Sequence, residues 1–199
     1  MAARVISISR TRGSLGEEVG RLVAERLGFR YLDEEIVSAA AARENVDPEL
    51  VADVERRRSF VERVLGALAV GGADAYAPPA PDETVDTEHY RTLIRATIEE
   101  AAGQGDVVIV AHAASYALAG SKGLLRVLVT ASPDVRGGRL GAEEGPKTVR
   151  RSDSGRADYL KRFYGIDAEL PTHYDLVVNT DSLSAQHAAA IVAGAAAEI

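Results

Sequence analysis

The amino-acid sequence predicts an α/β fold built on a mostly parallel sheet with helices on both faces. Short apolar runs rich in β-branched residues recur along the chain, and residues 107–110 (Val-Val-Ile-Val) are a clear example. Such runs lack polar alternation, which is typical of strands that are buried on both faces. Helical patterns alternate with these runs, and a glycine-containing turn directly follows the first of them. This alternation indicates consecutive βαβ units.

The individual elements follow from local periodicity and from the residues that end each pattern. Residues 4–9 alternate between polar and β-branched side chains and are expected to form the first strand. Apolar positions then recur at helical spacing over residues 17–27, and Gly28 ends this helix. Prolines and paired glycines mark residues 71–86 as a loop. The further expected strands are 29–32, 106–111, 124–130 and 176–178, and the further expected helices are 34–43, 48–70, 87–102, 134–140, 156–163 and 184–198.

Composition excludes several classes of protein. The 199 residues, of which 46% are hydrophobic, suit a single domain with a sizeable core. The absence of cysteine excludes disulfides and thiolate metal sites, and a net charge of −7 argues against a nucleic-acid-binding surface. The sequence has no secretory-type leader and no apolar stretch near the roughly 20 residues that span a bilayer. We therefore expect a cytoplasmic protein with no membrane partner; its oligomeric state is open.

The turn after the first strand, residues 10–18 (Arg-Thr-Arg-Gly-Ser-Leu-Gly-Glu-Glu), has the form of an anion site. Backbone N–H groups of a glycine turn that opens a helix point outward and favour negative charge. The P-loop pattern G-x-x-x-x-G-K-[ST] is absent, so the lysine that reaches the β- and γ-phosphates is missing. Arg10 or Arg12 could supply positive charge in its place, and Ser14 a hydroxyl.

Two other interpretations of this turn remain open. A dinucleotide-binding turn would have the pattern G-x-G-x-x-G, which is also absent, although Asp33 follows at about the spacing of a ribose-binding acid. The turn could instead be a tight connection that binds nothing, because short glycine patterns are weak evidence by themselves.

Longer segments carry more information than the turn alone, and they occur in a consistent order. Residues 9–19 match S-R-x-x-G-S-G-G-R-E-[IV] in part, residues 27–28 read L-G, and residues 31–36 read Y-x-D-x-E-I. The last third of the chain contains D-x-x-R-x-x-Y, then Y-G-I-D, then Y-D-L-V-V-N-T, at residues 153–159, 164–167 and 174–180. Together with residues 125–139, which resemble a strand and helix leading to a kinase lid, this ordered set resembles the cytidylate kinase-like family.

The resemblance implies a P-loop NTPase-type three-layer sandwich with a five-stranded sheet, formed by one domain over residues 1–199. It also implies a helical acceptor-binding insertion over residues 34–105 and an arginine-rich lid-like segment over residues 136–158. The implied activity is transfer of the γ-phosphoryl group of ATP to a nucleoside monophosphate or a similar small acceptor, with cytidylate as the default. Mg²⁺ would arrive with ATP as the cofactor, and the partners would be the nucleotide and the acceptor.

The resemblance also assigns roles to single residues. The catalytic candidates are four arginines, Arg10, Arg136, Arg139 and Arg156. The candidates for binding the ATP phosphates are Arg10, Arg12, Gly13, Ser14, Leu15, Gly16 and Glu17. Asp33 and His112 are expected near the acceptor, Arg150, Arg151 and Asp153 in the lid, and Ser14 and Asp33 are the side chains that could approach Mg²⁺.

Two departures from the family pattern support an alternative function. Relatives tend to carry Gly-Gly where this chain has Leu15-Gly16, and Gly-Arg-Gly where residues 111–113 read Ala-His-Ala. The chain could therefore be a nucleotide-binding regulatory module with an inactive loop, or, as a weaker alternative, an NAD(P)-binding domain. Less specific roles are also open: Arg136 and Arg139 could form a solvated helix face, and Asp33 could cap a helix.

Overall fold

The computed structural model describes residues 3–33, 95–96, 98–111, 114–141 and 143–199. Its strands are β1 (Val5–Arg10), β2 (Arg30–Asp33), β3 (Val107–Val110), β4 (Leu124–Thr130) and β5 (Leu176–Asn179). Its helices are α1 (Gly16–Leu27), α5 (Ala114–Ala117), α6 (Pro133–Leu140), α7 (Gly145–Tyr164), η2 (Pro171–His173) and α8 (Ala185–Glu198), and residues 98–103 are also helical.

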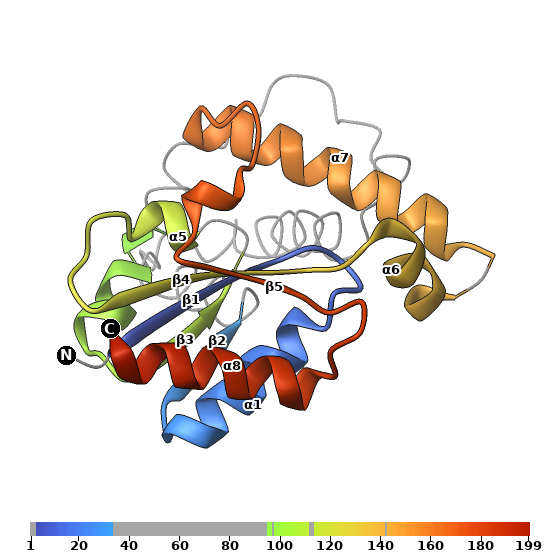
Figure 1. The fold of residues 1–199 in the computed structure, drawn as a ribbon. Helices are drawn as coiled ribbons and strands as arrows, with labels where there is room; N and C mark the ends of the chain where they lie inside the picture. Colours follow the sequence, from blue (N-terminus) through green and yellow to red (C-terminus); the bar gives the residue numbers. More distant parts are fainter. Residues whose placement is uncertain (1–2, 34–94, 97, 112–113, 142) are drawn as a thin grey trace, which may run out of the picture.

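The five strands form one sheet in the order β2-β3-β1-β4-β5, and all four pairings are parallel. The expectation of a five-stranded α/β sheet is confirmed, and the sheet is entirely rather than mostly parallel. Because the strands run in one direction, their carboxyl ends lie along one edge, which we call the C-terminal edge. The chain termini lie at the opposite edge, the N-terminal edge (Figure 1).

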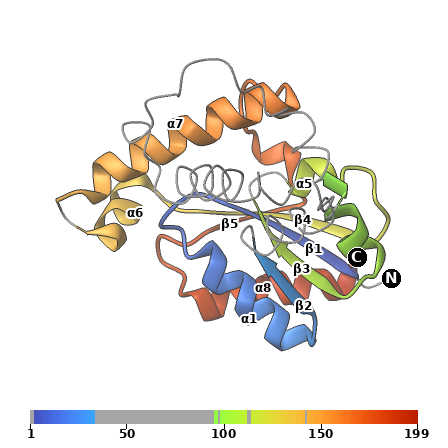
Figure 2. The same cartoon turned by 180° about the vertical axis from the view of Figure 1, so that it is seen from behind.

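The helices form layers on the two sides of the sheet. Helices α1 and α8 pack side by side against one face, and α5 and α7 lie on the other side (Figures 1 and 2). The pleat of β1 separates its side chains accordingly: Ile6 and Ile8 enter the core beneath α1 and α8, whereas Ser7 faces the other way and hydrogen-bonds Ser115 of α5. Central strand β1 therefore places small polar side chains beneath the face that carries α5.

The largest difference from the sequence-based expectation is the length of α7. We expected a helix from residue 156 after a polar, glycine-containing segment, but the helix begins at Gly145, with Pro146 in its first turn. Proline suits a first helical turn because the N–H that it lacks would have no intrahelical partner there. The lid-like segment 136–158 is therefore largely helical, made of most of α6 and the first part of α7.

Other expectations fall outside the described residues. These are the helices at 34–43 and 48–70, the loop at 71–86, most of the insertion at 34–105, and His112. The division into one domain, insertion and lid therefore stays a prediction. Within the described part of the chain, no helix is long and apolar enough to cross a membrane.

Candidate functional site

The glycine turn lies at the C-terminal edge of the sheet, between the end of β1 and the start of α1. Gly13 has a φ of +82°, and Leu15, directly before the helix, has a φ of +66°. The left-handed conformation is unusual for a branched side chain such as leucine and shows that the loop geometry is imposed by its surroundings. Strand β1 lies between β3 and β4, so the loop occupies the crevice position where open parallel sheets bind ligands.

Hydrogen bonds from the neighbouring strand ends fix the inside of the loop. The Ser14 N–H donates to the Thr11 carbonyl at 3.1 Å, and the Ser14 hydroxyl donates to the Val129 carbonyl at 3.0 Å. The Thr180 hydroxyl contacts the Ser14 carbonyl at 2.9 Å. Ser14 is fully buried. Its hydroxyl therefore faces the end of β4, and the structure gives no support to the expectation that it approaches Mg²⁺.

Three arginines from α6 and α7 hold three carbonyl groups of the loop. Arg156 donates to the Arg10 carbonyl at 3.2 Å, Arg136 to the Arg12 carbonyl at 3.3 Å, and Arg139 to the Gly13 carbonyl at 3.0 Å. Guanidinium groups carry only donors, so each can contact several oxygens at once. The arginines of the lid-like segment thus bind the loop directly.

Each of these arginines is also held by a second group. Arg136 is only 4% exposed and makes a bidentate pair with Asp153, with distances of 2.8 and 2.7 Å. Arg139 donates to the Thr180 carbonyl at 2.5 Å. The alternative of a solvated helix face is therefore wrong for Arg136, because its guanidinium is buried and paired. Asp153 orients this arginine, whereas Arg150 is exposed on α7 and Arg151 is half-buried.

Helix α6 and the loop are in close backbone contact at Gly13. A Cβ atom at Gly13 would lie 2.9 Å from the Arg136 carbonyl oxygen and 3.2 Å from the Arg136 Cα. Only glycine fits this approach, and only glycine adopts the positive φ without strain. Gly13 therefore joins the loop to the helix that carries Arg136 and Arg139.

The two arginines of the loop itself have different environments. Arg10 pairs with Glu17 of α1 at 2.6 Å and has a mostly buried side chain. Within the part of the chain that the structure describes, no hydrogen bond or ion pair holds the Arg12 guanidinium, and its Nε is buried without a partner. Arg12 is therefore the loop cation whose charge no carboxylate among the described residues balances.

Asp33, which is expected near the acceptor, lies farther along the same edge. Asp33 ends β2 and is paired in register with Val110, the last residue of β3. His112 follows β3 in the sequence but lies outside the described residues. Among the residues that are described, no group of three acidic or histidine side chains could hold a metal ion. The role of Asp33 near the acceptor or a magnesium ion therefore stays a prediction.

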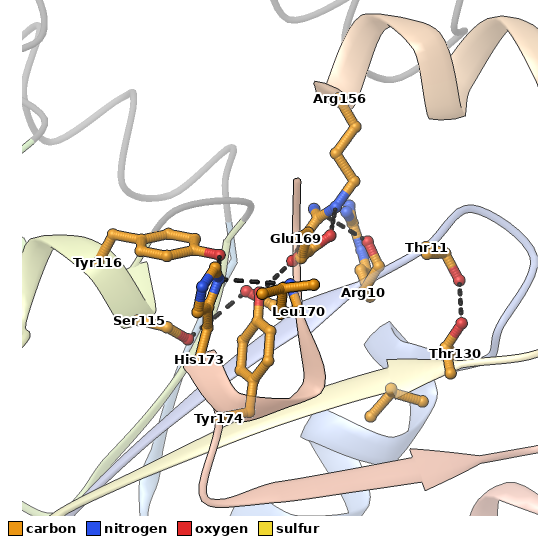
Figure 3. Close-up of polar contacts among 12 residues, drawn as sticks. Arg10, Thr11, Ser115, Tyr116, Thr130, Arg156, Glu169, Leu170, His173 and Tyr174 are labelled. Carbon is orange, nitrogen blue, oxygen red and sulfur yellow. Dashed lines mark hydrogen bonds and ion pairs between the residues drawn. The ribbon is translucent and has the colours of Figure 1, made fainter. Parts of the chain in front are cut away.

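Glu169 and Tyr174 were not selected from the sequence, yet they lie beside the loop. Glu169 accepts two hydrogen bonds from Arg156, at 2.7 and 2.5 Å, and the Tyr174 hydroxyl also donates to it (Figure 3). Burial first, and then the hydrogen bond to Glu169, raise the pKa of Tyr174 far above its usual value. Tyr174 belongs to the Y-D-L segment that indicated the family, so a signal existed for it. The pattern around Glu169 contained no comparable signal.

Next to Glu169 and Tyr174, Tyr116 of α5 contacts His173 of η2. The Tyr116 hydroxyl lies 3.0 Å from His173 Nδ1, and the Tyr116 ring meets the ring of Tyr174 edge-on at 6.3 Å (Figure 3). Burial raises the pKa of Tyr116, so its hydroxyl stays protonated at neutral pH. The side of the sheet that carries α7 therefore has a cluster of aromatic side chains, Tyr116, His173 and Tyr174, whose hydroxyl and ring nitrogen atoms form hydrogen bonds near the loop.

Comparisons with known proteins agree with this architecture. The chain is 26% identical over 202 residues to a cytidylate kinase of Methanocorpusculum labreanum, with 98% of this chain and 97% of the relative covered. A crystal structure of an uncharacterized protein from Eubacterium ventriosum superposes with a TM-score of 0.66 at 14% identity, covering 96% of this chain and 97% of that one. A shikimate kinase from Bacteroides thetaiotaomicron superposes with a TM-score of 0.51 at 16% identity, covering 98% and 96%.

The structural neighbours support the P-loop kinase-type fold that was expected from the sequence. A family model described as the cytidylate kinase-like family matches residues 5–182, which span all five strands and every described helix except α8. Family membership also supports the expectation of a nucleotide-kinase type of phosphotransferase. The chain belongs to the cytidylate kinase-like family.

Proposed function

We propose that this protein transfers the γ-phosphoryl group of ATP to a nucleoside monophosphate, with cytidylate as the first acceptor to test. The observation that carries the proposal is the Arg12 guanidinium, which lies in the loop at the C-terminal edge with no protein partner in the described structure. A partly buried cation without a counter-ion is costly, and a bound phosphate would remove that cost.

The backbone of the loop supports the same ligand. Carbonyls of residues 10, 12 and 13 point to arginines of α6 and α7, and the loop continues into the N-terminus of α1. Consecutive N–H groups before a helix form an anion-binding concavity, and the helix dipole favours negative charge there. Arg12 would then take the place of the missing P-loop lysine, because a guanidinium can donate two parallel hydrogen bonds to one phosphate.

Phosphoryl transfer requires alignment of the two substrates and positive charge near the transferred group. Arg12 and the loop N–H groups would bind the donor phosphates, and Arg136, Arg139 and Arg156 would hold the loop in shape. Arg10 would join the phosphate contacts if the nucleotide displaces Glu17 from it. Mg²⁺ bound to ATP would neutralise part of the phosphate charge, and Asp33 is the residue that would contact the ion or its water.

The kinase proposal can be tested by phosphorus NMR of the purified protein with magnesium-ATP and a panel of nucleoside monophosphates. The appearance of ADP together with one nucleoside diphosphate is expected, and it would identify the acceptor. Absence of transfer to every acceptor, with the fold intact by circular dichroism, would contradict the proposal.

A nucleotide-binding module without turnover is the second candidate, and one observation favours it. Arg136 and Arg156, both buried, already have carboxylate partners in Asp153 and Glu169, and this leaves fewer free cations for a transition state. This candidate predicts ATP binding without ADP production. Isothermal titration alongside the NMR experiment separates it from the kinase, and absence of binding would exclude both.

A further inference from the structure

The first peptide of the phosphate loop, between Arg10 and Thr11, is held from both sides. The Arg10 carbonyl accepts a hydrogen bond from Arg156 at 3.2 Å, and the Thr11 N–H donates to the Val129 carbonyl at 3.2 Å. The C=O and N–H of one trans peptide point in opposite directions, so these two bonds fix the rotation of the peptide plane. This plane sets the direction in which the loop leaves β1.

The contact on the α7 side depends on Arg156, which is only 6% exposed. Its Nε and Nη2 bind the two carboxylate oxygens of Glu169, which leaves Nη1 directed at the Arg10 carbonyl. A bidentate pair fixes the plane of the guanidinium, because both of its hydrogen bonds must lie near that plane. The position of Nη1 therefore follows from the position of the Glu169 carboxylate.

The Glu169 carboxylate is in turn held by Tyr174, which is 7% exposed and lies two residues before the start of β5. The Tyr174 hydroxyl donates to Glu169 Oε1, the oxygen that also accepts from Arg156 Nη2 (Figure 3). The raised pKa of this hydroxyl keeps it protonated, and therefore a donor, at neutral pH. The order of contacts is thus Tyr174, Glu169, Arg156 and the Arg10 carbonyl.

We infer that Glu169 and Tyr174 are positioning residues that set the geometry of the phosphate loop through Arg156. Under the function proposed above, they would act on the nucleotide only through Arg156 and the loop. Their effect on nucleotide binding rests on that proposed function, whereas their effect on the loop itself does not. A segment more than 150 residues away from the loop along the chain thereby determines its shape.

Amide hydrogen exchange of the ligand-free protein, read by NMR, tests the inference. In Tyr174→Phe, the Thr11 and Ser14 amides should exchange about fivefold faster than in the wild type, the factor expected for one lost hydrogen bond. Glu169→Gln should give a larger increase at the same two amides. Amides in the middle of β3, such as Val108, should keep their rates, because a local change in the loop does not open the core.

Asp175→Asn is the matched control. Asp175 also forms a bidentate pair with an arginine, Arg126, at 3.1 and 2.6 Å, but this pair lies at the N-terminal edge and does not touch the loop. Asp175→Asn should leave the Thr11 and Ser14 exchange rates within about twofold of the wild type, since no bond to the loop is lost.

Equal acceleration of loop and core amides in Tyr174→Phe would overturn the inference, because it would show a general loss of stability. Unchanged loop amides in Tyr174→Phe would overturn it as well, even if Glu169→Gln does not fold. If the loop amides respond as expected but the wild type shows no protection by magnesium-ATP, the positioning role stands and the proposed function fails. If magnesium-ATP protects the wild type, its dissociation constant should rise about fivefold in Tyr174→Phe, in line with the exchange factor.

Discussion

The two edges of the sheet use the same ion pair, arginine with a carboxylate, in different ways. At the N-terminal edge, Arg4 pairs with Asp106 with side chains 65% and 53% exposed, and Arg126 pairs with Asp175 at 32% and 34%. At the C-terminal edge, the guanidinium groups of Arg136 and Arg156 are 4% and 6% exposed and also bind carbonyls of the phosphate loop. The two pairs at the C-terminal edge thus differ from the two at the N-terminal edge in that their arginines are buried and also contact the backbone of the loop.

This difference indicates where the molecule depends on its electrostatics. Exposed pairs gain little because water competes for both charges, whereas a buried arginine needs all of its oxygen partners. Among the described residues, the C-terminal edge therefore combines buried pairs that hold the loop with Arg12, a loop cation that has no partner there, whereas the N-terminal edge carries pairs that need no ligand. Substitutions at the two edges should consequently differ in size and in their effect on nucleotide binding.

The largest expected difference between the edges concerns two glycines with positive φ. Gly13 has a φ of +82° and no room for a Cβ, whereas Gly28, after α1, has a φ of +68° and no described atom within 4 Å of a Cβ built there. Gly28→Ala should cost about 1 kcal/mol, the strain of the left-handed conformation alone. Gly13→Ala should cost about 3 kcal/mol, because the contact with Arg136 adds to that strain.

Urea unfolding of both glycine variants measures this difference in stability, and titration with ATP measures whether nucleotide binding changes as well. Only Gly13→Ala should weaken ATP binding. Equal losses of stability in the two variants would show that the close approach of α6 to the loop has no energetic weight.

The next largest effect is expected from removing one carboxylate at each edge. Asp153→Ala leaves the buried Arg136 with two carbonyl partners and no counter-charge, and should lower the free energy of unfolding by about 2 kcal/mol. This value lies below the roughly 3–5 kcal/mol of a fully buried pair, because Asp153 is itself 39% exposed. Asp106→Asn should leave the urea midpoint unchanged within error, because Arg4 becomes solvated and asparagine tolerates the φ of +49° at this position. A shift in Asp106→Asn as large as that in Asp153→Ala would remove the distinction between the edges.

The smallest effect is a pH dependence at the N-terminal edge. Hydrogen bonding to Arg126 lowers the pKa of Asp175 below its usual value. A carboxyl with a depressed folded-state pKa adds stability above its unfolded pKa of about 3.9, and this stability is lost as the pH falls through the folded-state value. The wild type should therefore be more stable than Asp175→Asn at pH about 6, with the difference shrinking below pH about 4. Thermal unfolding at several pH values measures it, and a difference that grows in acid would contradict the assignment.

The sequence predicted the α/β class, the family and most elements because these depend on local patterns. The apolar run at residues 107–110 and the helical spacing over residues 17–27 are contained within single elements. The length of α7 was underestimated because Gly155 and the polar residues around it suggested a break. A glycine on an exposed helix face costs only about 1 kcal/mol, which the flanking packing of α7 outweighs.

The candidate site was predicted in part. Gly13 and the arginines in α6 and α7 were expected near the phosphates, and Asp153 was expected to orient one of these arginines. Glu169 and Thr180 were not expected as partners, because they reach the loop only through the tertiary fold. The burial of Ser14 was equally invisible, since it depends on the end of β4, more than a hundred residues away along the chain. Which of Arg10 and Arg12 lacks a counter-ion likewise depended on the rotamer of Glu17.

Isothermal titration with magnesium-ATP tests the central claim, that Arg12 is the free cation of a phosphate site, most directly. Wild-type protein should bind, Arg12→Ala should bind at least about tenfold more weakly, the loss expected for a charged hydrogen-bonding partner, and Arg12→Lys should recover part of the affinity. Arg26→Ala, which removes an exposed arginine from the other end of α1, should bind like the wild type. Wild-type affinity in Arg12→Ala, or an equal loss in Arg26→Ala, would contradict the account.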